Sequence, residues 1–157
     1  MSAIAYIYRC DSCGTEFEAP EVPEMSYGLF VMRTLESSEA VFLDAHKDAA
    51  FLESYDIVKR NPFIRGLTPE ECGKIQQTVF SVTCDRSPAG KSFEIGIPPK
   101  CPSCGSRVIQ SWHPVEPFRD WPLPSVGHRS WESKSPVERE ALIDDAVRRL
   151  LEGGADR

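Results

Sequence analysis

The sequence lacks a hydrophobic run long enough to span a membrane, and its start lacks the features of a signal peptide. Every apolar stretch falls short of the ~20 residues that a membrane helix needs. The opening MSAIAYIYRC has no basic region, no sustained apolar stretch and no cleavage site. We therefore expect a cytoplasmic protein without a membrane partner, in a compartment that keeps thiols reduced.

A basic field is also missing. The chain carries 18 Lys and Arg against 24 Asp and Glu, which gives a net charge of −6. Proteins that bind nucleic acid usually present clustered Lys and Arg to the phosphates, and the densest cluster here is VRR near the C-terminus. The composition therefore argues against a nucleic-acid partner.

Known catalytic motifs are absent as well. The sequence contains no phosphate-binding glycine loop, no HExxH and no GxSxG. Its three histidines are in no recognised catalytic spacing, and we expect His46, in a turn after FLDA, to hydrogen-bond to the backbone. The sequence predicts a protein that is not an enzyme.

Cysteine is the residue type with the clearest pattern. Of six cysteines, four form two matching motifs, CDSCG (10–14) and CPSCG (101–105). A tight turn between paired cysteines directs backbone N–H groups at the sulfurs, and the following glycine tolerates the positive φ that ends the turn. Two such turns facing each other supply four sulfurs at ~2.3 Å in a tetrahedron, which suits zinc.

The two motifs, each placed between short predicted strands, resemble the knuckles of a zinc ribbon. YRCDSCGTEFE is similar to the start of the small FmdB-type zinc-ribbon regulatory proteins and to the first knuckle of rubredoxin, and CPSCG is similar to the second. The resemblance covers about residues 4–20 and 99–112. It implies four metal ligands, namely Cys10, Cys13, Cys101 and Cys104. Compact members of these families use a much shorter link between knuckles, so we interpret the middle of this chain as an insertion.

Several kinds of chemistry are open to such a site. Four thiolates leave no position for the water of a catalytic zinc. A CPSC redox pair would have to open a helix, whereas strand-like RVIQSW follows here. We favour a structural zinc, with a rubredoxin-like iron site for electron transfer as the alternative. The remaining cysteines, Cys72 and Cys84, are predicted to be buried thiols.

Hydrophobic periodicity predicts both strands and helices. The predicted strands are 3–9, 15–19, 27–34, 39–45, 93–97 and 107–112, of which 27–34 and 39–45 form a β-hairpin. Helical spacing follows three residues that are placed to cap helices, namely Asp48, Thr68 and Ser135. We expect the last helix to end at Gly153 and Gly154. Its predicted apolar stripe is Val137, Ile143, Ala146, Val147, Leu150 and Leu151.

Residues 113–136 have an unusual composition, with five prolines and two tryptophans. Proline disfavours helices and central strands, so we predict an extended arm. Four residues of this arm either pin it against the body of the protein or form a partner-binding surface. They are Trp121, His128, Arg129 and Trp131, and pinning is the preferred interpretation.

These patterns predict an α+β fold with a split zinc ribbon of short antiparallel strands, an inserted β-hairpin and two helices, and a C-terminal helix. The predicted domains are a discontinuous ribbon (1–24 plus 92–113), an inserted αβ unit (25–91), and an arm with a C-terminal amphipathic helix (114–157). The predicted function is a zinc-stapled binding or adaptor module with a protein partner, of which a regulatory protein is one form. The alternatives are rubredoxin-like electron transfer and a nucleic-acid-binding zinc ribbon.

Overall fold

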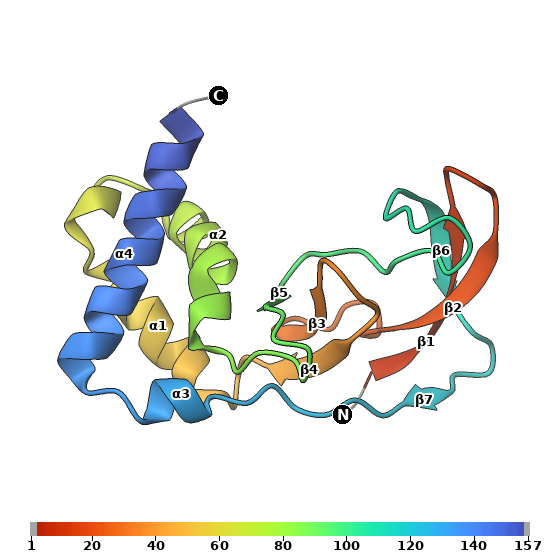
Figure 1. The fold of residues 1–157 in the computed structure, drawn as a ribbon, viewed down its shortest axis with the longest axis horizontal. Helices are drawn as coiled ribbons and strands as arrows, with labels where there is room; N and C mark the ends of the chain where they lie inside the picture. Colours follow the sequence, from red (N-terminus) through yellow and green to blue (C-terminus); the bar gives the residue numbers. More distant parts are fainter. Residues whose placement is uncertain (1–2, 156–157) are drawn as a thin grey trace. The chain divides into compact units, whose positions relative to one another are not determined.

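The computed structural model describes residues 3–155 and divides them into two compact units. The first unit comprises residues 3–46 and 86–126 and holds the strands, and the second comprises 47–85 and 127–155 and holds the helices (Figure 1). The predicted α+β class with short antiparallel strands and a C-terminal helix is confirmed. The prediction grouped the hairpin with the two inserted helices, whereas in the structure the hairpin belongs to the first unit and the C-terminal helix to the second.

The first unit contains two antiparallel sheets. In chain order the strands are β1 (Ala3–Cys10), β2 (Glu16–Glu21), β3 (Leu29–Thr34), β4 (Ala40–Asp44), β5 (Phe93–Glu94), β6 (Ile109–Pro114) and β7 (Asp120–Trp121). One sheet has the order β2-β1-β6, with β7 also pairing with β1, and the other has the order β4-β3-β5. The predicted hairpin is therefore present as β3 and β4, and β5 joins it from a distant part of the chain.

Strand β1 carries the core of its sheet and leads into the first cysteine motif. Alternate residues of a strand share one face, so Tyr6 and Tyr8 lie on the same side and are buried. Tyr6 is opposite Ala19 and Tyr8 is opposite Phe17 on β2, with the rings of Tyr8 and Phe17 stacked at 5.8 Å. This packing fixes the end of β1, where Cys10 is the last residue.

A buried arginine of β3 connects the two sheets. The guanidinium of Arg33 donates to the carbonyl oxygens of Pro20 and Ile97 and pairs with the carboxylate of Glu21 at 3.5 Å. Because a buried charge is costly unless it is paired and hydrogen-bonded, these acceptors explain how Arg33 is accommodated. Strands β2 and β3 are thereby joined through one side chain.

The second unit is built from four α-helices and two 3-10 turns. They are α1 (Ala49–Lys59), η1 (Pro62–Ile64), α2 (Pro69–Val79), η2 (Phe80–Thr83), α3 (Arg129–Glu132) and α4 (Pro136–Ala155). Helix α4 packs against α1 and α2 (Figure 1) and buries Ile143 and Val147 completely. Among residues 3–155, no helix is long and apolar enough to cross a membrane.

The helices begin where their capping residues predict. Asp48 accepts a hydrogen bond from Phe51 N at 2.8 Å, and Thr68 forms a complete capping box with Glu71. Ser135 Oγ accepts from the backbone N–H of Glu138 at 3.2 Å. Each cap satisfies N–H groups that have no partner within the helix.

Two predictions about the last helix are wrong. Helix α4 continues to Ala155 instead of ending at Gly153, since an interior glycine weakens a helix without breaking it. Its buried stripe is also narrower than predicted, because Val137, in the first turn, is 78% exposed.

The proline-rich segment is not uniformly extended. Its residues Asp120 and Trp121 form β7 on β1, and Arg129–Glu132 form α3. Between these elements, Phe42 N donates to Pro124 O at 2.9 Å, and Val126 N donates to Phe42 O at 3.0 Å. The prolines are compatible with this pairing because a proline carbonyl still accepts a hydrogen bond.

Candidate metal centre

The first cysteine motif is a tight turn at the end of β1. Gly14 N donates to Cys10 O at 2.9 Å, and Cys10 N donates to Thr15 O at 2.9 Å. Gly14 has φ +74°, a conformation that residues with a Cβ rarely adopt. The turn therefore places Cys10 and Cys13 on one side of the loop. As the sequence predicts, Gly14 adopts the positive φ that ends the turn.

The second motif repeats this geometry. Gly105 N donates to Cys101 O at 2.9 Å, Cys101 N donates to Ser106 O at 2.8 Å, and Gly105 has φ +77°. A hydroxyl pair joins the two turns, because Ser12 Oγ donates to Ser106 Oγ at 2.9 Å. The two knuckles thus face each other in the structure.

The structure brings the four predicted cysteines together. All four Sγ atoms lie within 4.8 Å of one another. The Sγ atoms of Cys10 and Cys104 are 3.5 Å apart, and those of Cys13 and Cys101 are 3.7 Å apart. A tetrahedron with metal–sulfur distances of ~2.3 Å has edges of about 3.8 Å, whereas a disulfide would need ~2.05 Å. The donor set therefore fits one tetrahedral metal ion.

The electrostatics of the four thiols also point to a cation. Cys13 Sγ lies 3.1 Å from Thr15 Oγ1, and this hydroxyl lowers the pKa of Cys13 to about 6. The backbone N–H of Ser106 favours the Cys104 thiolate, but the adjacent thiols outweigh it and raise the pKa of Cys104 to about 12. Four thiolates at these distances repel one another. A metal ion between them would remove the conflict and release protons as it binds.

The four ligands differ in their access to solvent. Cys10 and Cys101 are buried, and Cys13 and Cys104 are exposed. The buried pair follows from the packing of β1 and of the segment before the second turn, while the exposed pair lies at the outer end of each turn. The centre is thus anchored in the first unit and open to solvent on one side.

These observations define a candidate four-cysteine metal centre that joins chain segments 88 positions apart. Comparison of the chain with known protein families, curated proteins and solved structures finds no match. The likeness to a zinc ribbon therefore depends on the cysteine cluster and its two knuckles, and a fold alone would not assign a function.

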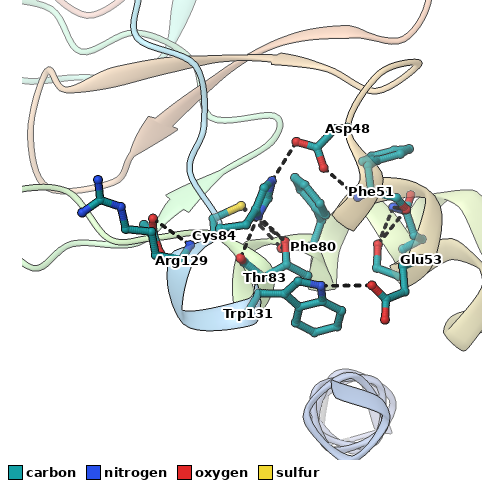
Figure 2. Close-up of polar contacts among 12 residues, drawn as sticks. Asp48, Phe51, Glu53, Phe80, Thr83, Cys84, Arg129 and Trp131 are labelled. Atoms are coloured by element: carbon teal, nitrogen blue, oxygen red, sulfur yellow. Dashed lines mark hydrogen bonds and ion pairs between the residues drawn. The ribbon is translucent and has the colours of Figure 1, made fainter. Parts of the chain in front are cut away.

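The four residues predicted from the proline-rich segment are not brought into one unit. Trp121 is half-buried on β7 of the first unit, whereas His128, Arg129 and Trp131 belong to the second. Trp131 is 2% exposed, and its indole N–H donates to Glu53 Oε2 at 3.3 Å (Figure 2). Of the three residues in the second unit, Arg129 alone is exposed.

Sequence reasoning did not select Trp112, the most exposed tryptophan. Its side chain on β6 is 58% exposed, although its strand neighbour Tyr8 is buried. Strand β6 is at the end of the order β2-β1-β6 and pairs with β1 along one of its edges. Residues 110–113 of β6 are all exposed. Alternation along RVIQSW predicts a strand but does not indicate which strand lies at an edge, so the signal for this residue is absent from the local sequence.

The other histidine and cysteine predictions have clear structural outcomes. His46 Nε2 hydrogen-bonds with the carbonyl oxygen of Tyr27 at 2.8 Å, as expected for a turn histidine. Cys72 is buried, which confirms its prediction. Cys84 is partly buried, and burial raises the pKa of its thiol to about 12, so this cysteine stays protonated at neutral pH.

Proposed function

We propose that this protein is a non-enzymatic binding module whose four-cysteine centre holds a structural zinc ion. The observation that carries the proposal is the set of four Sγ atoms within 4.8 Å of one another. Cys10, Cys13, Cys101 and Cys104 would fill the coordination sphere of a tetrahedral zinc and leave no position for water or substrate. The ion would then contribute folding energy, because it joins two knuckles that no disulfide connects.

A protein is the partner class that we propose for this module, in the cytoplasm, where thiols stay reduced. The exposed Trp112 supports this choice, since tryptophan is enriched among the residues that dominate protein interfaces. The net charge of −6 gives no support to a nucleic-acid partner. A regulatory role is one form of this proposal.

Iron is the second candidate for the metal, and electron transfer is the corresponding function. Sulfur ligation by four cysteines also suits a single iron ion. The exposure of Cys13 and Cys104 favours this candidate, because electrons would reach the centre from that side. The two metals differ in colour and composition, so one measurement separates them.

We expect the purified protein to contain one zinc per chain and to be colourless. The measurement is elemental analysis with a visible absorption spectrum, after expression in medium that supplies both zinc and iron. The matched control is Cys72→Ser, which changes a buried cysteine outside the cluster and should keep the metal. One iron per chain with visible absorption would support electron transfer instead, and a chain without metal would contradict both functions.

Trp112→Ala is expected to reduce strongly the capture of the partner by the tagged protein in its native cell extract while leaving the metal content unchanged. Removal of an exposed aromatic anchor typically costs an interface about 2 kcal/mol or more, or at least a tenfold loss of affinity. Tyr27→Ala is the control, because Tyr27 is also an exposed aromatic residue of the first unit. Quantitative mass spectrometry of the captured proteins decides the result. Equal capture by wild type and Trp112→Ala would exclude this residue from the interface.

A further inference from the structure

The second unit has three points at which the chain enters or leaves it, after residues 46, 85 and 126. One polar residue near each point takes part in a cluster within this unit, in which His128 contacts both of the others. Asp48 precedes α1, Thr83 ends η2, and His128 precedes α3. We refer to these three residues as the His128 cluster.

The imidazole of His128 is the centre of this cluster. Its side chain is 9% exposed and its ring packs edge-on against Phe80 at 5.6 Å. Nε2 lies 2.7 Å from Asp48 Oδ2, and Nδ1 lies 2.8 Å from Thr83 O. Figure 2 shows these contacts as the dashed lines that reach Asp48 and Thr83. One ring therefore connects segments that are distant in the sequence.

The chemistry of the two acceptors specifies the protonation state. An ionised carboxylate and a backbone carbonyl can only accept hydrogen bonds. Both ring nitrogens of His128 must therefore carry protons if both contacts are hydrogen bonds, which makes the ring an imidazolium. Asp48 is fixed in place by its second oxygen, because Oδ1 accepts from Phe51 N at 2.8 Å and caps α1.

The charged groups around the ring favour the same state. Burial of the ring lowers its pKa, but the hydrogen bonds to Asp48 and Thr83 and the charges of Asp48 and Asp85 outweigh burial, so the pKa of His128 is raised. Asp85 itself accepts from the backbone N–H groups of Arg129 and Ser130 at 3.1 and 3.2 Å.

Groups on the remaining neighbours do not offset these carboxylates. The Cys84 thiol beside Thr83 stays neutral. Glu53 on α1 is paired with Arg139 of α4 at 3.1 Å. The side chain of Arg129, next to His128 in the chain, is exposed to solvent, where its charge is largely screened. The ion pair between Asp48 and His128 is thus the dominant electrostatic contact of the cluster.

We propose that His128 is a pH-dependent tie that joins the ends of the second unit when it is protonated and loosens them when the proton leaves. The carboxylate of Asp48 retains the proton on Nε2, so Nδ1 is the atom that releases its proton to water. The Nδ1 lone pair then faces the carbonyl oxygen of Thr83, and this hydrogen bond between η2 and His128 is lost. The Thr83 hydroxyl lies 3.3 Å from Nδ1 but donates to Phe80 O at 2.9 Å. The hydrogen bonds of Asp85 to Arg129 and Ser130 remain, so the contact between η2 and the start of α3 is weakened.

The sign of the pH dependence follows from the raised pKa. A group that gains affinity for its proton on folding stabilises the fold fully below its unfolded pKa, which is ~6.5 for histidine. This contribution is lost as pH rises through the higher folded pKa. The second unit is therefore expected to be more stable in mildly acidic than in alkaline solution.

The test is a proton NMR titration of the histidine rings in the full-length, metal-loaded protein between about pH 5 and 9. His128→Gln assigns the resonance. We expect the pKa of His128 to lie above ~6.5, the ordinary value for histidine. A midpoint at or below ~6.5 would overturn the proposal.

Asp48→Asn isolates the charge. The amide oxygen of asparagine can still cap α1, and its N–H group can donate to Nε2 of a neutral ring, so the hydrogen bonds survive without the ion pair. We expect the His128 midpoint to fall by about one pH unit or more. Asp56→Asn removes an exposed carboxylate from α1 and should leave the His128 midpoint unchanged.

Thermal unfolding followed by circular dichroism adds a second readout. The melting temperature of the wild type should fall more between pH 6 and 9 than that of Asp48→Asn. An equal fall in both proteins, or an unchanged midpoint in Asp48→Asn, would refute the tie. If Asp48→Asn does not fold, the midpoint of His128 in the wild type, compared with the ordinary histidine value of ~6.5, still decides the question.

Discussion

Cys101→Ser is expected to lose the metal and to destabilise the first unit more than any other substitution considered for this protein. Cys101 is 1% exposed, and its Sγ lies 3.7 Å from that of Cys13 in the other knuckle. Structural zinc sites contribute binding free energies of about 10–16 kcal/mol, most of which acts as folding energy. Removing one of four thiolates should forfeit several kcal/mol of that contribution.

The measurement is metal content together with thermal unfolding, with and without a strong chelator. Wild type should unfold at a much lower temperature once the chelator is present, whereas Cys101→Ser should melt low in both conditions. Cys72→Ser makes the same atomic change at a buried site in the second unit and should keep the metal and its response to the chelator. A wild-type melting temperature that the chelator does not change would show that the metal does not hold the fold together.

Trp131→Ala is expected to cost the second unit about 3–5 kcal/mol of folding free energy, as other buried tryptophan truncations do. The indole is 2% exposed and packs under the guanidinium of Arg139, which lies 5.5 Å from the ring centre. The same guanidinium donates to Trp131 O at 3.0 Å and to the carboxylate of Glu53. Truncation would leave a cavity and remove the surface on which Arg139 and Glu53 are arranged.

Denaturant unfolding monitored by circular dichroism at helical wavelengths checks this value. Trp112→Ala is the matched control, since it deletes the same side chain from a site that is 58% exposed. We expect the control to lose less than about 1 kcal/mol. Similar losses in the two variants would contradict the structural role assigned to Trp131.

Features that depend on a few neighbouring residues could be predicted from the sequence. The caps at Asp48 and Thr68 and the knuckle turns at Gly14 and Gly105 each involve contacts within about five positions. The four-cysteine cluster could also be predicted, although it joins distant segments, because the repeated CxxCG pattern marks both halves. In these cases residues close together in the sequence determine the local structure.

Features that depend on long-range pairing could not be predicted. Strand β5 joins β3 through the pair of Thr34 and Phe93, and no local pattern in either segment indicates this partner. The packing of α4 with α1 and α2 is of the same kind. Burial of Trp131 and exposure of Trp112 likewise depend on which elements cover them, while both residues look alike in the sequence.

The wide separation of the two knuckles has a consequence for how the protein is made. Cys13 and Cys101 are 88 positions apart, and ribosomes add ~5–20 residues per second, so roughly 4 to 18 s pass between the synthesis of the two. During that interval the first knuckle has only the thiols of Cys10 and Cys13, which can chelate an ion only weakly or react with an oxidant. The second unit also cannot complete its packing during this interval, because α4 follows the second knuckle in the chain. If the centre binds the proposed zinc, all four thiolates can hold the ion only after the second knuckle has emerged.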